Sequence, residues 1–142
     1  MFKKILVPTD ASEYSKRALK VALELARTFQ AEVEVIHVTF SPQAYWGYTL
    51  SYGISITQED LNRNGEIALE ATLAGMNREG VQIKTVLYSG HPVSKIVEEI
   101  QNEKIDLVVM GSHGYGVITG SVFGSVSQRV LQKSPCPVLI IK

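Results

Sequence analysis

The sequence predicts an α/β fold: a largely parallel sheet with helices on both faces. Three observations support this prediction. Short, wholly apolar runs such as residues 5–7 and 138–141 are typical of strands that are covered on both faces. Amphipathic stretches with helical spacing separate these runs. Strands alternate with helices along all 142 residues, which indicates βαβ units in one domain, residues 1–142.

The first half of the chain is predicted to be strand, helix, strand, loop and helix. Residues 5–7 lead into Thr9-Asp10-Ala11-Ser12-Glu13, which are turn and N-cap residues. The helix that follows carries one apolar stripe, made of Ala18, Val21, Ala22, Leu25, Ala26 and Phe29. Residues 31–38 form the second strand. Residues 39–56 lose periodicity and predict a long loop.

The alternation continues after the loop. A helix is predicted to begin at Thr57 and to end at Gly80. Residues 81–88 alternate apolar and polar side chains, which is typical of a half-exposed edge strand. The remaining elements are a helix that begins around Pro92, a buried strand at 105–110, a helix at 125–133 and a last strand at 138–141.

A glycine-rich motif follows the strand at 105–110. Gly111-Ser112-His113-Gly114 comes directly after the strand, and Gly124-Ser125-Val126-Ser127 opens the next helix. Glycines permit sharp turns and a close approach of the backbone to a ligand. A helix N-terminus offers unpaired N–H groups and a partial positive charge. The motif therefore favours a site for a phosphate chain. The alternative is that this segment only connects a strand to a helix and has glycines because its turns must be flexible.

In an open parallel sheet, ligands bind beyond the carboxyl ends of the strands, where the strand order reverses. If the first and fourth strands are neighbours, Asp10 and the Gly111 loop face the same crevice. Asp10 then has two possible roles, a ligand contact and the N-cap of the first helix, and its two oxygens allow both together. His37 lies near the end of the second strand, and we interpret it as a hydrogen-bonded core residue rather than a ligand.

Composition excludes several classes of function. Lys plus Arg and Asp plus Glu both count 14, so the chain has no basic excess for nucleic acid. The single Cys136 forms no internal disulfide, and no His/Asp/Glu set has the spacing of a metal site. The N-terminal apolar run stops at Pro8, and no segment is long enough to span a bilayer. We expect a cytoplasmic protein without a membrane segment.

With these segments in view, the chain resembles the universal stress proteins of the UspA-like family. The resemblance covers nearly the whole chain except residues 39–56 and rests on residues 5–13, 90–92, 106–114, 124–127 and 136–140. Its most specific part is the family's ATP-binding signature: Gly, two residues, Gly, nine residues, then Gly and Ser or Thr. Gly111, Gly114, Gly124 and Ser125 fill this signature completely.

The resemblance implies an open five-stranded parallel sheet of order 3-2-1-4-5, of the adenine-nucleotide alpha-hydrolase-like kind. It also implies binding of ATP or another adenine nucleotide, with any Mg²⁺ carried by the phosphates. Asp10 is expected by the ribose, flanked by Pro8 and Thr9, and Val38 and Met110 by the base. The phosphates are expected among the backbone amides and hydroxyls of Gly111, Gly114, Gly124, Ser125, Val126 and Ser127.

The sequence departs from the family pattern in two places. Ala11 stands where the family commonly has Gly, and Ser112-His113 stand where it often has Arg. His113 can still donate to a phosphate, more strongly when protonated. The resemblance further implies a homodimer formed by antiparallel pairing of the last strand, Val138–Ile141. The aromatic residues Tyr45, Trp46, Tyr48 and Tyr52 are expected to pack on their own domain or to meet a partner, rather than to stack on the base.

Three functions compete at this point. The first is a nucleotide-binding stress or signalling protein that acts through its bound state and its dimer, with a downstream partner that the sequence does not name. The second is a slow ATPase or phosphotransferase; no Lys or Arg lies between Gly111 and Gln128, and no catalytic residues are recognised, which disfavours fast phosphoryl transfer. The third, a dinucleotide-dependent oxidoreductase, is disfavoured because the first strand leads into Pro8-Thr9-Asp10-Ala11 rather than a glycine fingerprint.

Overall fold

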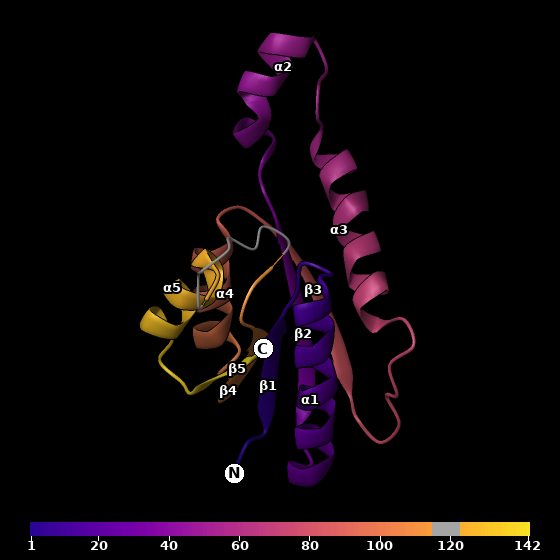
Figure 1. The fold of residues 1–142 in the computed structure, drawn as a ribbon, viewed down its shortest axis with the longest axis vertical. Coiled ribbons are helices and arrows are strands. Elements are labelled where there is room, and N and C mark those ends of the chain that lie inside the picture. Colours follow the sequence, from indigo (N-terminus) through magenta and orange to yellow (C-terminus); the bar gives the residue numbers. More distant parts are fainter. Residues whose placement is uncertain (115–122) are drawn as a thin grey trace.

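A computed structural model, which describes residues 1–114 and 123–142, places five parallel strands in one sheet (Figure 1). The strand order is β3-β2-β1-β4-β5, and every pairing is parallel. The strands are β1 (Lys4–Pro8), β2 (Glu32–Thr39), β3 (Ile83–Ser89), β4 (Leu107–Gly111) and β5 (Val138–Ile141). The predicted fold class and strand order are confirmed, and β1 and β4 are neighbours.

Four longer helices cover the two faces of this sheet. They are α1 (Glu13–Phe29), α3 (Gln58–Leu73), α4 (Pro92–Asn102) and α5 (Ser125–Lys133). Side chains of α1 and α3 pack with one set of strand residues, and side chains of α4 and α5 pack with the other set. Because successive strand side chains point to opposite faces, each central strand contributes to both clusters. No helix among residues 1–114 and 123–142 is long and apolar enough to cross a membrane.

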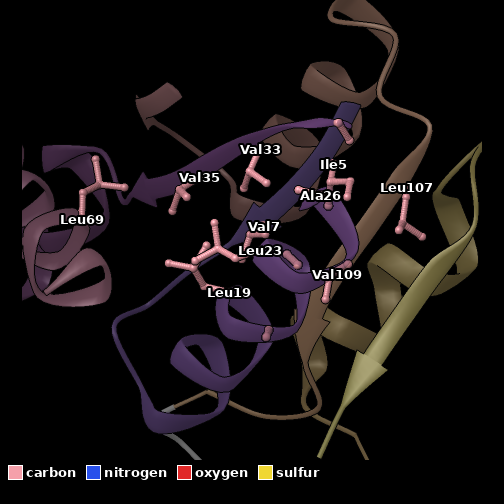
Figure 2. Close-up of a cluster of buried hydrophobic side chains, with 13 residues drawn as sticks. Ile5, Val7, Leu19, Leu23, Ala26, Val33, Val35, Leu69, Leu107 and Val109 are labelled. Carbon is pink, nitrogen blue, oxygen red and sulfur yellow. The ribbon is translucent and has the colours of Figure 1, made fainter. Parts of the chain in front are cut away.

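The core under α1 explains why the first half of the chain folds as predicted (Figure 2). Ile5 and Val7 from β1 and Val33 and Val35 from β2 are fully buried. The apolar stripe of α1 lies on them and contributes Ala18, Leu19, Ala22, Leu23 and Ala26. Burial of such aliphatic side chains stabilises the fold by about 1.5–3 kcal/mol for each large one.

Both long helices in the first half have side-chain caps. Ser12 is the N-cap of α1 and accepts a hydrogen bond from the Ser15 amide at 3.3 Å. The N-cap alternative for Asp10 is therefore wrong, because the chain makes one more turn before the helix begins. Thr57 and Asp60 form a reciprocal capping box at the start of α3.

Two predicted boundaries need correction. Residues 39–56 are not a plain loop: they contain a 3₁₀ turn, η1 (Pro42–Tyr45), and a short helix, α2 (Trp46–Tyr52). Figure 1 shows α2 projecting beyond the sheet. A helix that does not pack on the sheet needs no apolar stripe, so the sequence lacks the pattern that would predict it. Helix α3 ends at Leu73 rather than near Gly80, because Gly75 takes a left-handed conformation with φ 74°.

Ala11 provides the first prediction. Its φ of 66° lies in the left-handed region, which costs an L-residue about 1–2 kcal/mol. Ala11→Gly should raise the free energy of unfolding by roughly 0.5–1 kcal/mol, after the greater backbone entropy of unfolded glycine is deducted. Urea unfolding measures this change. The control Ala71→Gly, inside α3, should instead lower stability by about 1 kcal/mol; equal losses in both variants would contradict the strain at Ala11.

Candidate functional site

A pocket of about 530 Å³ opens beyond the carboxyl ends of β1, β2 and β4. The chain crosses from β1 to β2 on one side, while β4 lies on the other side of β1, so this is the switch point of the sheet. The starts of α4 and α5 close the pocket on one side, and α3 contributes residues to its wall. Every residue that the sequence predicted for the site lines it: Pro8, Thr9, Asp10, Val38, Met110, Gly111, His113, Gly114, Gly124, Ser125, Val126 and Ser127.

Hydrogen bonds within the turn after β1 hold Asp10 at the pocket. Its Oδ1 accepts from the Ser12 amide at 2.9 Å and from the Ser15 hydroxyl at 3.2 Å. Thr9 is buried, and its hydroxyl lies 2.7 Å from that of Thr72 on α3. The Thr9 side chain therefore anchors the turn to α3, and its place in the pocket wall follows from that anchoring.

The signature glycines serve the packing of the protein itself. A Cβ on Gly111 would lie 2.7 Å from Tyr14 Cβ and 2.8 Å from the Tyr14 carbonyl carbon, so α1 crosses β4 only because this residue has no side chain. A Cβ on Gly114 would collide with the Asp10 carboxylate. Gly111 and Gly114 thus let the two halves of the pocket approach each other.

The carbonyl of Ser112 organises the start of α5. It accepts from the Gly124 amide at 2.6 Å and from the Ser127 hydroxyl at 2.8 Å. The Ser112 amide in turn donates to Ile141 on β5 at 2.8 Å. In this structure the Gly124 amide and the Ser127 hydroxyl both donate to a protein carbonyl, and their expected donation to a phosphate stays a prediction. Eight of the nine spacer residues of the signature, 115–122, lie outside the described residues.

The first turn of α5 supplies the donors that remain. Gly124 caps this helix without a side-chain hydrogen bond, and the amides of Ser125, Val126 and Ser127 find no acceptor among the described residues. All three residues line the pocket, and Ser125 is exposed. Together with the helix dipole, these N–H groups make the start of α5 attractive to an anion.

Few ionisable side chains line the described part of the pocket. No Lys or Arg lines it within residues 1–114 and 123–142; its titratable lining residues there are Asp10, His37, His113 and Tyr45. His113 Nδ1 lies 3.0 Å from the Ser112 hydroxyl, and its ring packs 5.4 Å from the ring of Tyr14. His37 is half-buried, with Nδ1 2.7 Å from the Thr9 carbonyl oxygen, as expected for a hydrogen-bonded histidine, but it also lines the pocket.

Sequence reasoning missed one wall of the pocket. That wall comes from the segment after β2, from α3 and from α4, and consists of Phe40, Tyr45, Leu61, Asn64, Gly65, Pro92 and Ile96. Leu61 is one of the buried residues of α3, and its apolar character is evident in the sequence, whereas the surface that it faces is not. The aromatic residues of 39–56 were the available signal for Tyr45, although their position depends on η1.

The model of the Universal stress protein family matches residues 1–142. The chain belongs to the universal stress protein family. Universal stress protein MJ0531 of Methanocaldococcus jannaschii is 36% identical over 143 residues, covering 100% of this chain and 83% of that relative.

Solved structures of universal stress proteins share the fold. Universal stress protein UspA from Lactobacillus plantarum aligns with a TM-score of 0.78 at 26% identity, covering 99% of this chain and 98% of that one. A universal stress protein crystallised in complex with cAMP aligns with a TM-score of 0.63 at 26% identity, covering 99% of this chain and 97% of that one.

The different surroundings of two signature glycines give a second prediction. Gly111→Ala should lower the free energy of unfolding by roughly 1–3 kcal/mol, because the added methyl group meets the backbone of α1. Gly124→Ala should cost less than about 1 kcal/mol, since its Cβ would lie 3.3 Å from the nearest atom, His113 Cα. Urea unfolding of both variants checks the order; a reversed order would contradict the packing role of Gly111.

Proposed function

We propose that this universal stress protein binds an adenine nucleotide in the pocket at the switch point, and that occupancy of the pocket carries a stress or signalling response. One observation carries the proposal: the first-turn amides of α5, which lack a protein acceptor among the described residues, face a pocket with an apolar floor. Amides arranged in this way suit a phosphate group, and an apolar floor suits a base.

The two ends of the pocket would then hold different parts of the ligand. Val38 and Met110, with Ile36 beside them, would contact the base. The Asp10 carboxylate, flanked by Pro8 and Thr9, would accept from ribose hydroxyl groups. The amides of Ser125, Val126 and Ser127 would donate to the phosphates, with His113 nearby.

Two further facts support the proposal. A relative with 26% identity was crystallised with cAMP, an adenine nucleotide. The pocket volume of about 530 Å³ is within the range of about 300–1,000 Å³ that small-molecule sites occupy. Among the described side chains no group of three His, Cys, Asp or Glu residues is arranged to hold a metal ion, so Mg²⁺ would arrive with the phosphates.

We favour binding over rapid hydrolysis. Phosphoryl transfer requires positioned cations and a group that orients the attacking oxygen. The described lining of the pocket offers no Lys or Arg for this task. Slow ATP hydrolysis is the second candidate function for the same pocket.

The free thiol of Cys136 supports a reducing compartment, and we propose that the protein acts in the cytoplasm.

A charge at the start of α5 tests the phosphate end. Ser125→Glu should lower ATP affinity at least about tenfold, because the carboxylate repels the phosphates that the amides would bind. The helix should remain folded, since an acidic residue in a first turn is favourable. Adenosine, which has no phosphate, should bind both proteins equally well by calorimetry.

The control for this prediction is Gln128→Glu. Gln128 is exposed on the same helix but does not line the pocket, so the added charge is equal and its position is different. The control should retain most of the ATP affinity. Equal affinity in the wild type and the Ser125→Glu protein would place the phosphates elsewhere.

We further propose that two chains pair along β5. This strand is at the edge of the sheet and pairs only with β4 among the described strands. Its residues are apolar, and Leu139 is 39% exposed. An exposed apolar edge favours pairing with a second strand.

Light scattering tests the dimer. The wild type should have twice the mass of one chain at micromolar concentration, and Leu139→Lys should have the mass of one chain, because a charge on an edge strand opposes pairing. Leu131→Lys on α5, where Leu131 is 42% exposed, is the matched control and should remain a dimer. A wild-type protein with the mass of one chain would contradict the proposal.

A further inference from the structure

Two carboxyl groups are buried together between α4 and the sheet. Glu34 on β2 is 6% exposed, and Glu99 on α4 is 3% exposed. Glu34 occupies the same face of β2 as Ile36, which belongs to the cluster under α4 and α5. Glutamates are almost never this buried unless they are paired, because burial strongly disfavours an isolated charge.

The nearby cations do not neutralise this pair. Lys84 on β3 lies 3.7 Å from Glu34 Oε2, but its side chain is 60% exposed, and it also lies 3.8 Å from Glu103 at the end of α4. Lys4 on β1 lies between Glu32 and Glu103, at 3.5 and 3.9 Å. Both lysines are therefore at the solvent edge of the cluster and are shared with other carboxylates, where ion pairs contribute little.

One oxygen of each buried carboxyl has no hydrogen-bond partner. Oε1 of Glu34 and Oε1 of Glu99 are both buried without a partner in the part of the chain that the structure describes. Tyr88 on β3 interacts with Glu99 in a way that keeps its hydroxyl protonated, which favours Glu99 as an acceptor. Two adjacent carboxyls with unsatisfied oxygens are satisfied when one of them carries a proton and donates it to the other.

We propose that Glu34 and Glu99 share one proton, and that this acid pair is a pH-sensitive latch that holds α4 on the sheet. With the proton present, the pair is a hydrogen bond between β2 and α4. Without it, two negative charges face each other in a buried site, with Glu103 adding to the repulsion. The same helix carries Pro92 and Ile96 in the wall of the pocket, so loosening of α4 would reach that wall.

The pKa values agree with this geometry. Burial raises the pKa of Glu34 to about 8, and its hydrogen bond to Glu99 and the charge of Glu99 act in the same direction, while Lys84 acts against them. The hydrogen bond to Glu99 also raises the pKa of Tyr88 to about 12, so Tyr88 remains a donor throughout the titration of Glu34.

The direction of the pH effect follows from linkage. Between the ordinary glutamate pKa of 4.5 and about 8, the folded protein binds a proton that the unfolded chain has released. The stabilising contribution of Glu34 is therefore complete below pH 4.5. It declines as the pH rises and is lost once the pH passes about 8.

The Glu34→Gln variant separates the effect of the Glu34 proton on stability from the effects of other titrating groups. Glutamine has the shape of the protonated acid but cannot ionise. The urea midpoint of the wild type should fall relative to that of Glu34→Gln as the pH rises from about 6 to about 9, so that the variant has the higher midpoint at the alkaline end. Glu98→Gln, an exposed position on the same helix, should follow the wild type at every pH. A constant difference between wild type and Glu34→Gln across this range would overturn the proposal.

Carbon NMR of the glutamate carboxyls gives an independent readout that does not depend on nucleotide. One resonance should titrate near pH 8 in the wild type and be absent from Glu34→Gln. In Glu99→Gln the Glu34 resonance should titrate at lower pH, because the neighbouring charge is gone. Titration of all glutamate resonances below about pH 6 in the wild type would show that no proton is shared.

Discussion

The parallel pairing of β1 with β4 is the constraint on which the pocket depends. Ile5 pairs with Leu107 and Leu6 with Val108, so two turns about a hundred residues apart in sequence leave the sheet side by side. The first turn carries Asp10 and the second carries Gly111 and Gly114. Their close approach requires glycine at both places, against Tyr14 and against Asp10. The signature is thus first a condition for packing, and the shape of the pocket follows from it.

The hydrogen-bond donors around the start of α5 fall into two groups: those that donate within the protein and those that find no protein acceptor among the described residues. The amides of Ser112 and Gly124 and the hydroxyl of Ser127 are used within the fold. The first-turn amides of α5 come next and have no such partner among the described residues. Under α4 the acidic side chains of Glu34 and Glu99 are buried within the protein itself. The first-turn amides of α5 and the buried acid pair under α4 therefore lie at different places on the same side of the sheet.

Much of this structure follows from sequence patterns with a physical cause. The last helix and strand were predicted at the bounds that the structure has, because Pro135 and Pro137 end the helix and a short apolar run marks the strand. Helix α2 was missed because an uncharged aromatic segment has no stripe to bury. The end of α3 was misplaced because Gly75 and Gly80 are equally plausible stops in sequence, and the structure gives both a positive φ. Glu34 lies in an alternating Glu-Val stretch that is typical of a half-exposed strand, and only the packing of α4 buries it.

The site residues that the resemblance implied all line one pocket. The wall from η1, α3 and α4 depends instead on tertiary packing that no local motif encodes.

The central claim, that the start of α5 receives the phosphates of an adenine nucleotide, is tested most directly by nitrogen–proton NMR during an ATP titration. ATP should cause saturable shifts of the Ser125, Val126 and Ser127 amides, larger than those produced by adenosine. ATP shifts confined to other surfaces, with these three amides unchanged, would contradict it.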